Sequence, residues 1–422
     1  MTLRPSTIFA AVLLCCASQS GAQLGGAGGL PGRLPTLPPT LLPALPNVGS
    51  VINPVLGEAT NLLNRSASAV SNTLRTARLE RIDTLLRDNR QTLERDREGE
   101  PARRGVLLLI DADAATLAGV AALGFSPGAP DQIEGLDVTV SKVTLPAGMS
   151  LRGAQQLLRK KLPAATISSD QIFFQSGDRG RAGGAAPIAA ANAINTPIGL
   201  IDGAAAQAVS ATKGFASGAP YPSNHGSAVA SLAQGAGART ILIADVYGTD
   251  PAGGNALAIA QGLGWLVGRG AKVIAISLVG PRSPLLERAV ASAQARGAII
   301  VAAVGNDGPA APPSYPASYR GVLAVTGVDK RNRPLIEAGR ALHLDYAAPG
   351  ADILARDRAG RMMPVRGTSF AVPLVAARAA AALDRGLSPR ALVDVLDTEA
   401  VPLSRRRPDP QSGRGLLCAD CR

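Results

Sequence analysis

The chain has 422 residues, which exceeds a single average domain and predicts two or three modules, at least one with a sizeable buried core. Hydrophobic residues make up 46% and charged residues 18%, a globular balance that excludes disorder throughout. The net charge is +12, but the arginines are scattered and aromatic residues make up only 3%. This favours a solvated basic surface over binding to nucleic acid or an anionic membrane.

The N-terminus has the features of an export signal. Arg4 precedes an apolar run over residues 8–17, and small residues at 20–22 resemble a cleavage site, so a signal peptide is predicted over 1–22. The run is too short for a membrane helix and no later stretch reaches about 18 apolar residues, so no stable membrane span is expected. We therefore expect a secreted or periplasmic protein.

Four segments precede the largest module. Residues 23–57, rich in Gly, Pro and Leu, predict a linker. Helically spaced apolar residues over 58–100 predict an amphipathic helix or helical hairpin, favoured as a spacer over a partner-binding element. A βαβαβ pattern over 101–175 predicts a small α/β domain, with elements at 106–110, 114–123, 136–145, 150–162 and 171–175. The Gly, Ala and Arg-rich residues 176–195 predict an exposed linker where the chain is processed.

From residue 196 to 422, strands and helices alternate, and apolar runs such as VIAISL are typical of fully buried strands. This pattern predicts an α/β fold with three layers, a mostly parallel sheet with helices on both faces. Strands are expected at 197–201, 240–246, 272–278, 298–304 and 322–328, and helices at 226–236, 255–268, 284–296 and 369–383. Ligands bind such sheets at the carboxyl ends of the strands.

Three polar residues are expected at this edge of the sheet. Asp202 ends a strand, whereas His225 and Ser369 each begin a helix. Each alone is more often a cap or a packed residue, but together they give the chain order Asp, His, Ser. A serine hydroxyl needs an adjacent base to attack a carbonyl at neutral pH, and an imidazole oriented by a carboxylate supplies one. His343, the other histidine of the two, is expected to be structural.

A fourth polar residue, Asn306, ends the apolar strand VAAVGNDG. Its carboxamide can donate a hydrogen bond to a developing oxyanion without carrying charge, although a turn residue is the alternative. With the segment GTSFAVP at 367–373, the chain resembles a subtilase, a subtilisin-like serine peptidase, from about residue 196 to 416. Further segments resemble the family in order, namely QGLGW at 261–265, YPA at 315–317, YAAPG at 346–350 and GRGL at 413–416.

The resemblance implies roles for individual residues. It makes Asp202, His225 and Ser369 the catalytic residues, with the Asn306 side chain and the Ser369 backbone N–H as the oxyanion hole. The segment Ser277, Leu278, Val279 and Gly280 resembles the edge where a peptide substrate adds as a strand. Pro373 is expected near the start of its helix, where a missing N–H costs little because first-turn N–H groups lack acceptors.

Two departures from the family pattern surround the catalytic residues. Asp202 is followed by Gly203-Ala204 where the family usually has Ser or Thr and then Gly, and His225 is followed by GSAVAS where GTxVAG is usual. Both keep the catalytic side chain. The substrate specificity is therefore less determined than the chemistry.

The sequence thus predicts an exported serine endopeptidase made as a zymogen. Its partners are polypeptide substrates and its own residues 101–175, which resemble the family's propeptide and would act as an intramolecular inhibitor. No cofactor and no obligatory metal are expected. Two alternatives stay open: a catalytically silent subtilase-fold protein that binds peptides, and an esterase that uses the same triad.

The two cysteines at the end of the chain, Cys418 and Cys421, are expected to form a local disulfide, because an exported chain meets an oxidising environment. A redox C-x-x-C motif would instead be expected to begin a helix after a strand.

Overall fold

The structure, a computed structural model, describes residues 49–180, 184–189 and 191–421. The signal peptide expected over 1–22 and most of the linker expected over 23–57 lie outside the described residues. The chain divides into two compact units, residues 1–59 and 60–422. The described part of the first unit is the start of one helix, and the second unit contains all the elements discussed below.

Seven strands, all parallel, form the central sheet in the order β11-β12-β10-β13-β15-β16-β17. Their bounds are Ala211–Gly214, Ile241–Asp245, Ile198–Asp202, Val273–Ile276, Ile299–Ala303, Leu323–Val328 and Tyr346–Pro349. The strands predicted from apolar runs are all present within two residues at either end. These strands are buried on both faces of the sheet, which explains why apolar side chains stand at successive positions and do not alternate with polar ones.

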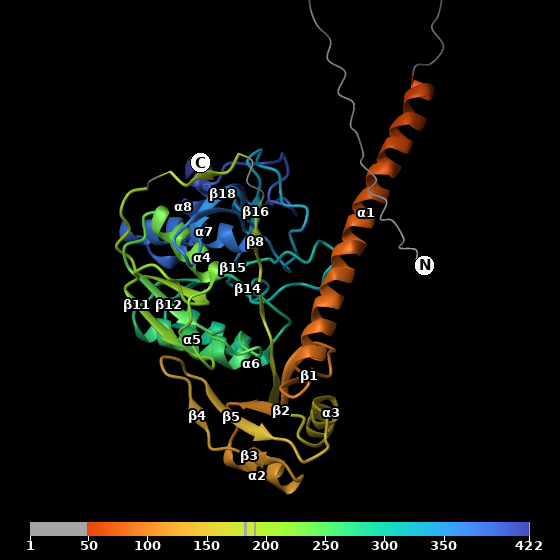
Figure 1. Ribbon diagram of the computed structural model, residues 1–422, viewed down its shortest axis with the longest axis vertical. Coiled ribbons are helices and arrows are strands. Elements are labelled where there is room, and N and C mark those ends of the chain that lie inside the picture. The colour runs from red at the N-terminus through yellow and green to blue at the C-terminus, as the bar shows by residue number, and fades with distance from the viewer. Residues whose placement is uncertain (1–48, 181–183, 190, 422) are drawn as a thin grey trace, which may run out of the picture. The chain divides into compact units, whose positions relative to one another are not determined.

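Helices cover both faces of this sheet (Figure 1). Their bounds are α4 Asn224–Gly235, α5 Ala256–Gly268, α6 Pro284–Ala295 and α7 Thr368–Asp384, and α8 Pro389–Glu399 packs against α7. Successive strand side chains point to opposite faces, so Leu200 packs with α4 and α7 whereas Ile201 packs with α5 and α6. The predicted three-layer α/β fold is confirmed.

A small α/β unit precedes this body. Its antiparallel sheet contains β1 Leu93–Arg95, β2 Pro101–Ile110, β3 Ser126–Pro127, β4 Asp131–Gln132, β5 Thr139–Thr144 and β6 Thr166–Gln171, and its helices are α2 Ala114–Ala122 and α3 Leu151–Lys161. Leu107 and Leu109 pack among the unit's own helices, whereas Leu108 and Ile110 join the hydrophobic cluster of α5 and α6. The small sheet is therefore buried on both faces, with the main body covering one of them (Figure 1).

The segment before this unit differs from its predicted bounds. One helix, α1 Gly49–Asp88, begins inside the expected linker and ends twelve residues before the expected end at 100. Residues 93–95 form β1, which pairs with β2, so the small unit begins at 93 and not at 101. Apolar spacing alone did not separate the last helical turns from the short strand that follows.

The tract expected to be an exposed linker over 176–195 is in part paired. Residues Asp178–Arg179 form β8 and Ala186–Pro187 form β9. They flank the hairpin of β18 Ala351–Arg356 and β19 Met362–Arg366 in a four-stranded sheet. Backbone pairing needs no particular side chains, which is why a Gly, Ala and Arg-rich composition did not reveal it.

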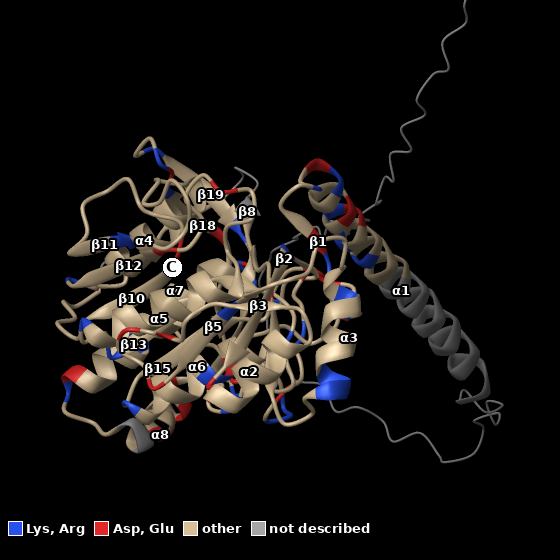
Figure 2. Cartoon of the chain, turned by 90° about the horizontal axis from the view of Figure 1, so that it is seen from below, with Lys and Arg blue, Asp and Glu red and all other residues tan. Residues whose placement is uncertain are grey.

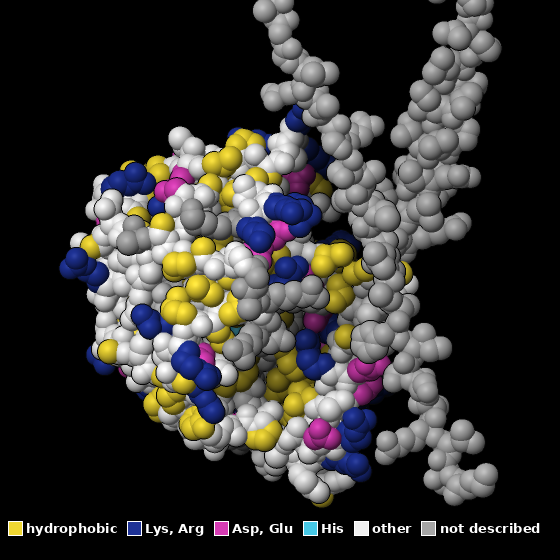
Figure 3. Space-filling model, turned by 45° about the horizontal axis from the view of Figure 1, so that its top comes forward, with side chains coloured by type: hydrophobic (Ala, Val, Ile, Leu, Met, Phe, Trp, Pro, Cys, Tyr) yellow, Lys and Arg dark blue, Asp and Glu magenta, His cyan; other side chains and the backbone are white. Residues whose placement is uncertain are grey.

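Charged side chains are dispersed over the molecule. Figure 2 shows basic and acidic residues interspersed along the ribbon, and Figure 3 shows Lys and Arg side chains scattered among acidic, apolar and other side chains on the face in view. Among the described residues, no helix combines the length and the apolar character required to cross a membrane. The described chain ends in a short 3₁₀ helix, Ala419–Cys421, where Cys418 and Cys421 are joined by a disulfide.

Candidate active site

Asp202 and His225 meet at the carboxyl edge of the central sheet. Asp202 is the last residue of β10, and His225 lies in the first turn of α4, which Ser223 caps by accepting a hydrogen bond from Gly226 N–H. The His225 Nδ1 lies 2.8 Å from Asp202 Oδ2 and 3.0 Å from Oδ1. Both side chains are buried, at 8% and 1% exposure. The carboxylate therefore fixes the orientation of the imidazole ring.

Ser369 lies at the start of α7, whose N-cap residue, Gly367, has no side chain with which to cap the helix. The Ser369 hydroxyl donates to the Ser277 carbonyl at 3.1 Å and lies 2.6 Å from the Ser176 hydroxyl. His225 Nε2 is buried and has no hydrogen-bond partner among the residues that the structure describes. The serine and the imidazole are thus neighbours of the same peptide segment without being hydrogen-bonded to each other.

Pro373 does not lie in the first helical turn, where the sequence analysis expected it. The helix begins at Thr368, so Pro373 is its sixth residue, and the N–H it lacks would have bonded to the Ser369 carbonyl. The Ser277 hydroxyl donates to that carbonyl instead, at 3.1 Å. Ser277 and Ser369 therefore hold each other by two hydrogen bonds, which fixes the backbone that carries the Ser369 hydroxyl.

Asn306 lies opposite the start of α7, in the loop after β15. Its Oδ1 accepts a hydrogen bond from Thr368 N–H at 3.1 Å, which leaves Nδ2, the donor end of the carboxamide, without a hydrogen-bond partner among the described residues. Gly367, the residue before Thr368, has a φ of +147° and lies next to both Asn306 and Ser176. A Cβ built on Gly367 would lie 2.6 Å from Asn306 Nδ2 and 2.8 Å from the Ser176 carbonyl oxygen. Only glycine leaves that space open.

A strand of the chain itself lies in the site. Residues Phe174–Gln175 form β7, which pairs antiparallel with β14 Leu278–Val279, in the register Leu278 to Gln175 and Val279 to Phe174. On its other edge, Phe173 N–H donates to the Gly254 carbonyl at 2.8 Å. The single strand predicted at 171–175 is thus divided, because the chain leaves β2 after Gln171 and pairs with the main body.

The peptide bond between Ser176 and Gly177 lies between Ser369 and His225. The Ser176 carbonyl accepts a hydrogen bond from Ser369 N–H at 3.0 Å. A Cβ on Gly177 would lie 2.5 Å from the Phe370 ring and 3.2 Å from His225 Nε2, so a larger residue does not fit there. Ser176 is only 3% exposed. The start of the predicted linker is therefore buried in the site and not exposed.

Phe173 anchors this strand. It is fully buried, and its ring lies flat against Gly280, where a Cβ would approach the ring to 2.5 Å. The Tyr247 hydroxyl donates to the Phe173 carbonyl at 2.9 Å. Burial, with the nearby Asp202 carboxylate as a smaller cause, raises the pKa of Tyr247 well above its ordinary value, which keeps this donor protonated.

Gln175 is a residue that the sequence analysis did not single out. Its Nε2 donates to Asp202 Oδ1 at 2.9 Å, so a side chain of the inserted strand reaches the carboxylate that orients His225. The signal that could have found it is its place directly before two small residues, Ser176 and Gly177, at the end of an apolar strand.

Helix α1 contacts the same edge of the site. The Arg81 guanidinium lies 4.6 Å from the centre of the Phe174 ring and 3.0 Å from the Asp307 carboxylate, next to Asn306. Arg78 pairs with Glu100 at 2.8 Å. An exposed ion pair such as that of Arg81 is worth less than about 1 kcal/mol, but the two Arg81 contacts tie α1 to the inserted strand and to the Asn306 loop. The half-buried pair of Arg78 and Glu100 ties α1 to the residue before β2.

The second histidine, His343, lies outside this site. His343 contacts the Val322 carbonyl at 2.9 Å, at the start of β16, and does not take part in these contacts. Among the described residues, no group of three or more His, Cys, Asp or Glu side chains is arranged to hold a metal ion.

A family model described as the subtilase family matches residues 206–415, which include His225, Asn306 and Ser369 and begin four residues after Asp202. The chain belongs to the subtilase family. Subtilisin Savinase of Lederbergia lenta is 40% identical over 128 residues, which cover 30% of this chain and 47% of that protein. Thermitase of Thermoactinomyces vulgaris is 32% identical over 166 residues, 39% of this chain and 58% of the other. The chain thus spans about half the length of these subtilase relatives.

A solved structure with the same fold extends further along the chain. Fervidolysin from Fervidobacterium pennivorans, described as a keratinolytic enzyme related to subtilisin, matches with a TM-score of 0.64 and 18% sequence identity. The match covers 78% of this subtilase and 63% of fervidolysin. At this identity the likeness shows a shared fold.

Proposed function

We propose that this subtilase is an exported serine endopeptidase, made as a zymogen, that hydrolyses peptide bonds through Asp202, His225 and Ser369. The observation that carries the proposal is the position of the Ser176 carbonyl, hydrogen-bonded to Ser369 N–H at 3.0 Å while its own strand pairs with β14. An extended peptide bound in this way presents one carbonyl to one hydroxyl. Export is supported by the N-terminal sequence alone.

In this proposal the Ser369 hydroxyl exchanges its present acceptor, the Ser277 carbonyl, for His225 Nε2. The oxygen attacks the substrate carbonyl carbon, and its proton passes to Nε2, while Asp202 holds the ring by Nδ1 and stabilises the imidazolium. The tetrahedral oxyanion accepts hydrogen bonds from Ser369 N–H and Asn306 Nδ2 at the positive end of α7. Collapse expels the amine, which takes the proton from Nε2, and water then hydrolyses the acyl-enzyme by the same path.

The proposal of a zymogen rests on strand β7, which lies in the site and belongs to the same chain as Ser369. Residues 93–176 would serve as the inhibitory segment, and the first cut would fall between Ser176 and Gly177, inside the tract 176–195 predicted for processing. Two observations support this bond over its neighbours. The Ser176 carbonyl accepts the hydrogen bond from Ser369 N–H, and only a glycine fits at position 177, beside the Phe370 ring.

The test is to express the full chain with and without Ser369→Ala. Under the proposal, the parent chain yields a new N-terminus at Gly177, reacts with a fluorophosphonate probe and hydrolyses casein, whereas Ser369→Ala accumulates uncut and unlabelled. A folded parent protein that stays unlabelled would favour the silent peptide-binding alternative. Hydrolysis of short esters without hydrolysis of casein would favour the esterase alternative.

A further inference from the structure

The Asp202 carboxylate is in contact with the strand of the chain that lies in the site, β7. Three donors contact this carboxylate: His225 Nδ1, the Gly203 N–H at 2.7 Å, and Gln175 Nε2 at 2.9 Å. The first two belong to the main body, and the third comes from the strand that lies in the site. Asp202 itself is only 1% exposed, so its charge is poorly solvated and gains from each donor.

Gly203, which follows Asp202, adjoins the contact between Gln175 and Asp202, although a Cβ there would crowd Ser223 and not Gln175. A Cβ at Gly203 would lie 2.5 Å from Ser223 Oγ and 3.7 Å from Gln175 Nε2. This glycine stands where the family usually has Ser or Thr, and it was one of the two departures that the sequence analysis left without a function. The departure therefore coincides with the contact between the strand and the catalytic carboxylate.

The register of β7 fixes which substrate position reaches Asp202. With the cut after Ser176, Gln175 is the second residue before the cut bond, the position called P2. Gln175 lies opposite Leu278 in β14, and the side chain before it, Phe174, points instead to Arg81. Alternation along a strand places successive side chains on opposite faces, so P2 reaches Asp202 whereas P3 does not.

We propose that Asp202 is also a specificity determinant, and that this enzyme selects peptide substrates with a neutral carboxamide, above all glutamine, at P2. The inference rests on the proposed function. A hydrogen bond from the substrate to a carboxylate is a charge-assisted one, stronger than a neutral pair. It is formed on binding, before the carbonyl is attacked, so it lowers KM and leaves kcat nearly unchanged. Glutamate at P2 would place a second negative charge beside Asp202 and is selected against.

The experiment uses the purified active enzyme and peptides with the sequence Phe-Phe-X-Ser-Gly, in which X is Gln, Met or Glu. Methionine matches glutamine in length and cannot donate the hydrogen bond. We expect kcat/KM for Gln to exceed that for Met by about tenfold, with the difference in KM, and Glu to be the poorest of the three. The matched control places Gln or Met at P3, where the two should be hydrolysed equally.

Each outcome bears on one of the two claims. If Gln and Met at P2 give kcat/KM values within twofold of each other, or if Glu equals Gln, the inference is wrong while the proposed function stands. A difference that appears in kcat alone would also overturn it, since the hydrogen bond would then not act on binding. If none of the peptides is hydrolysed by the folded protein, the proposed function fails and the inference fails with it.

Discussion

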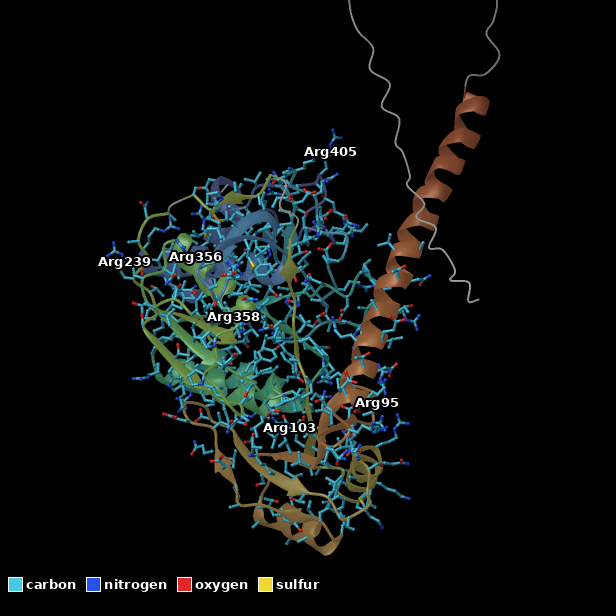
Figure 4. The ribbon with its side chains drawn as sticks, viewed as in Figure 1. Arg95, Arg103, Arg239, Arg356, Arg358 and Arg405 are labelled. Carbon is cyan, nitrogen blue, oxygen red and sulfur yellow. A yellow bond between two sulfur atoms is a disulfide. The ribbon has the colours of Figure 1, made fainter. Side chains whose placement is uncertain are left out.

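Asp170 is a buried carboxyl group at the junction of the small α/β unit and the main body. It accepts a hydrogen bond from Leu257 N–H in the first turn of α5, at 2.9 Å. Arg103, which reaches across the junction (Figure 4), lies 3.6 Å away and also pairs with Asp250. Burial nevertheless outweighs the backbone hydrogen bond and the attraction of Arg103 and Lys142, and raises the pKa of Asp170 from 3.8 to about 6.

A raised pKa means that the folded chain binds this proton more tightly than the unfolded chain. The stabilisation is present below pH 3.8, the unfolded value, and is lost as the pH rises through about 6. Linkage over these two values gives a loss of about 2 kcal/mol between pH 4 and pH 7. Asp170→Asn keeps an oxygen acceptor for Leu257 N–H but never ionises. We therefore expect the variant to gain about 2 kcal/mol relative to the parent over this pH interval.

The assay is equilibrium urea denaturation of the full chain from pH 4 to pH 7, with Ser369→Ala in both proteins to prevent cleavage. Trp265, the only tryptophan of the sequence, lies buried in α5 close to the junction and reports the transition. Asp113→Asn is the matched control, because the hydrogen bond with Thr116 lowers the pKa of this exposed cap and its effect has the opposite sign. A difference between Asp170→Asn and the parent that stays constant with pH would refute the reasoning.

Two further predictions concern the site itself. Asn306→Ala should lower kcat for peptide hydrolysis by about 10²–10³ and leave KM nearly unchanged, because it removes one oxyanion donor and no substrate contact. A kcat equal to that of the parent would show that Nδ2 does not face the oxyanion. Phe173→Ala, measured by urea denaturation with Ser369→Ala, should lower the free energy of unfolding by about 3–5 kcal/mol, since the ring is fully buried. Phe174→Ala, which removes a half-buried ring, should cost less, and equal losses would contradict the assignment of Phe173 as the anchor.

Much of the main body could be predicted from the sequence because its strands are buried on both faces. The runs VIAISL and AIIVAAV are too apolar and too rich in β-branched residues for any other position, and the helices between them begin at Ser, Asn or Pro. The candidate catalytic residues could be predicted from their positions at the ends of these strands and helices, namely Asp202, His225 and Ser369. For these residues local sequence and global fold agree, and the structure brings the Asp202 and His225 side chains into contact.

What could not be predicted depends on pairing between distant segments. The strands β8, β9 and β14 are two residues long and draw their hydrogen bonds from partners far away in the sequence, so no local periodicity marks them. For the same reason the prediction of one continuous strand over 171–175 was wrong, because β6 ends at Gln171 and β7 begins at Phe174. Its residues suit a strand throughout, but the pairing partner changes from β2, at Gln171, to β14, at Phe174, and the partner of a strand cannot be read from the segment itself.

This arrangement also bears on what cleavage between Ser176 and Gly177 would accomplish. On one side of that bond, β7 is held by β14 and by the buried Phe173 ring. On the other side, β8 is held by β19. Cutting the bond would break none of these contacts, so the segment that we propose to be inhibitory would stay in the site as a bound product. Release would then require a weakening of the junction itself, and the loss of the Asp170 proton above about pH 6 acts in that direction.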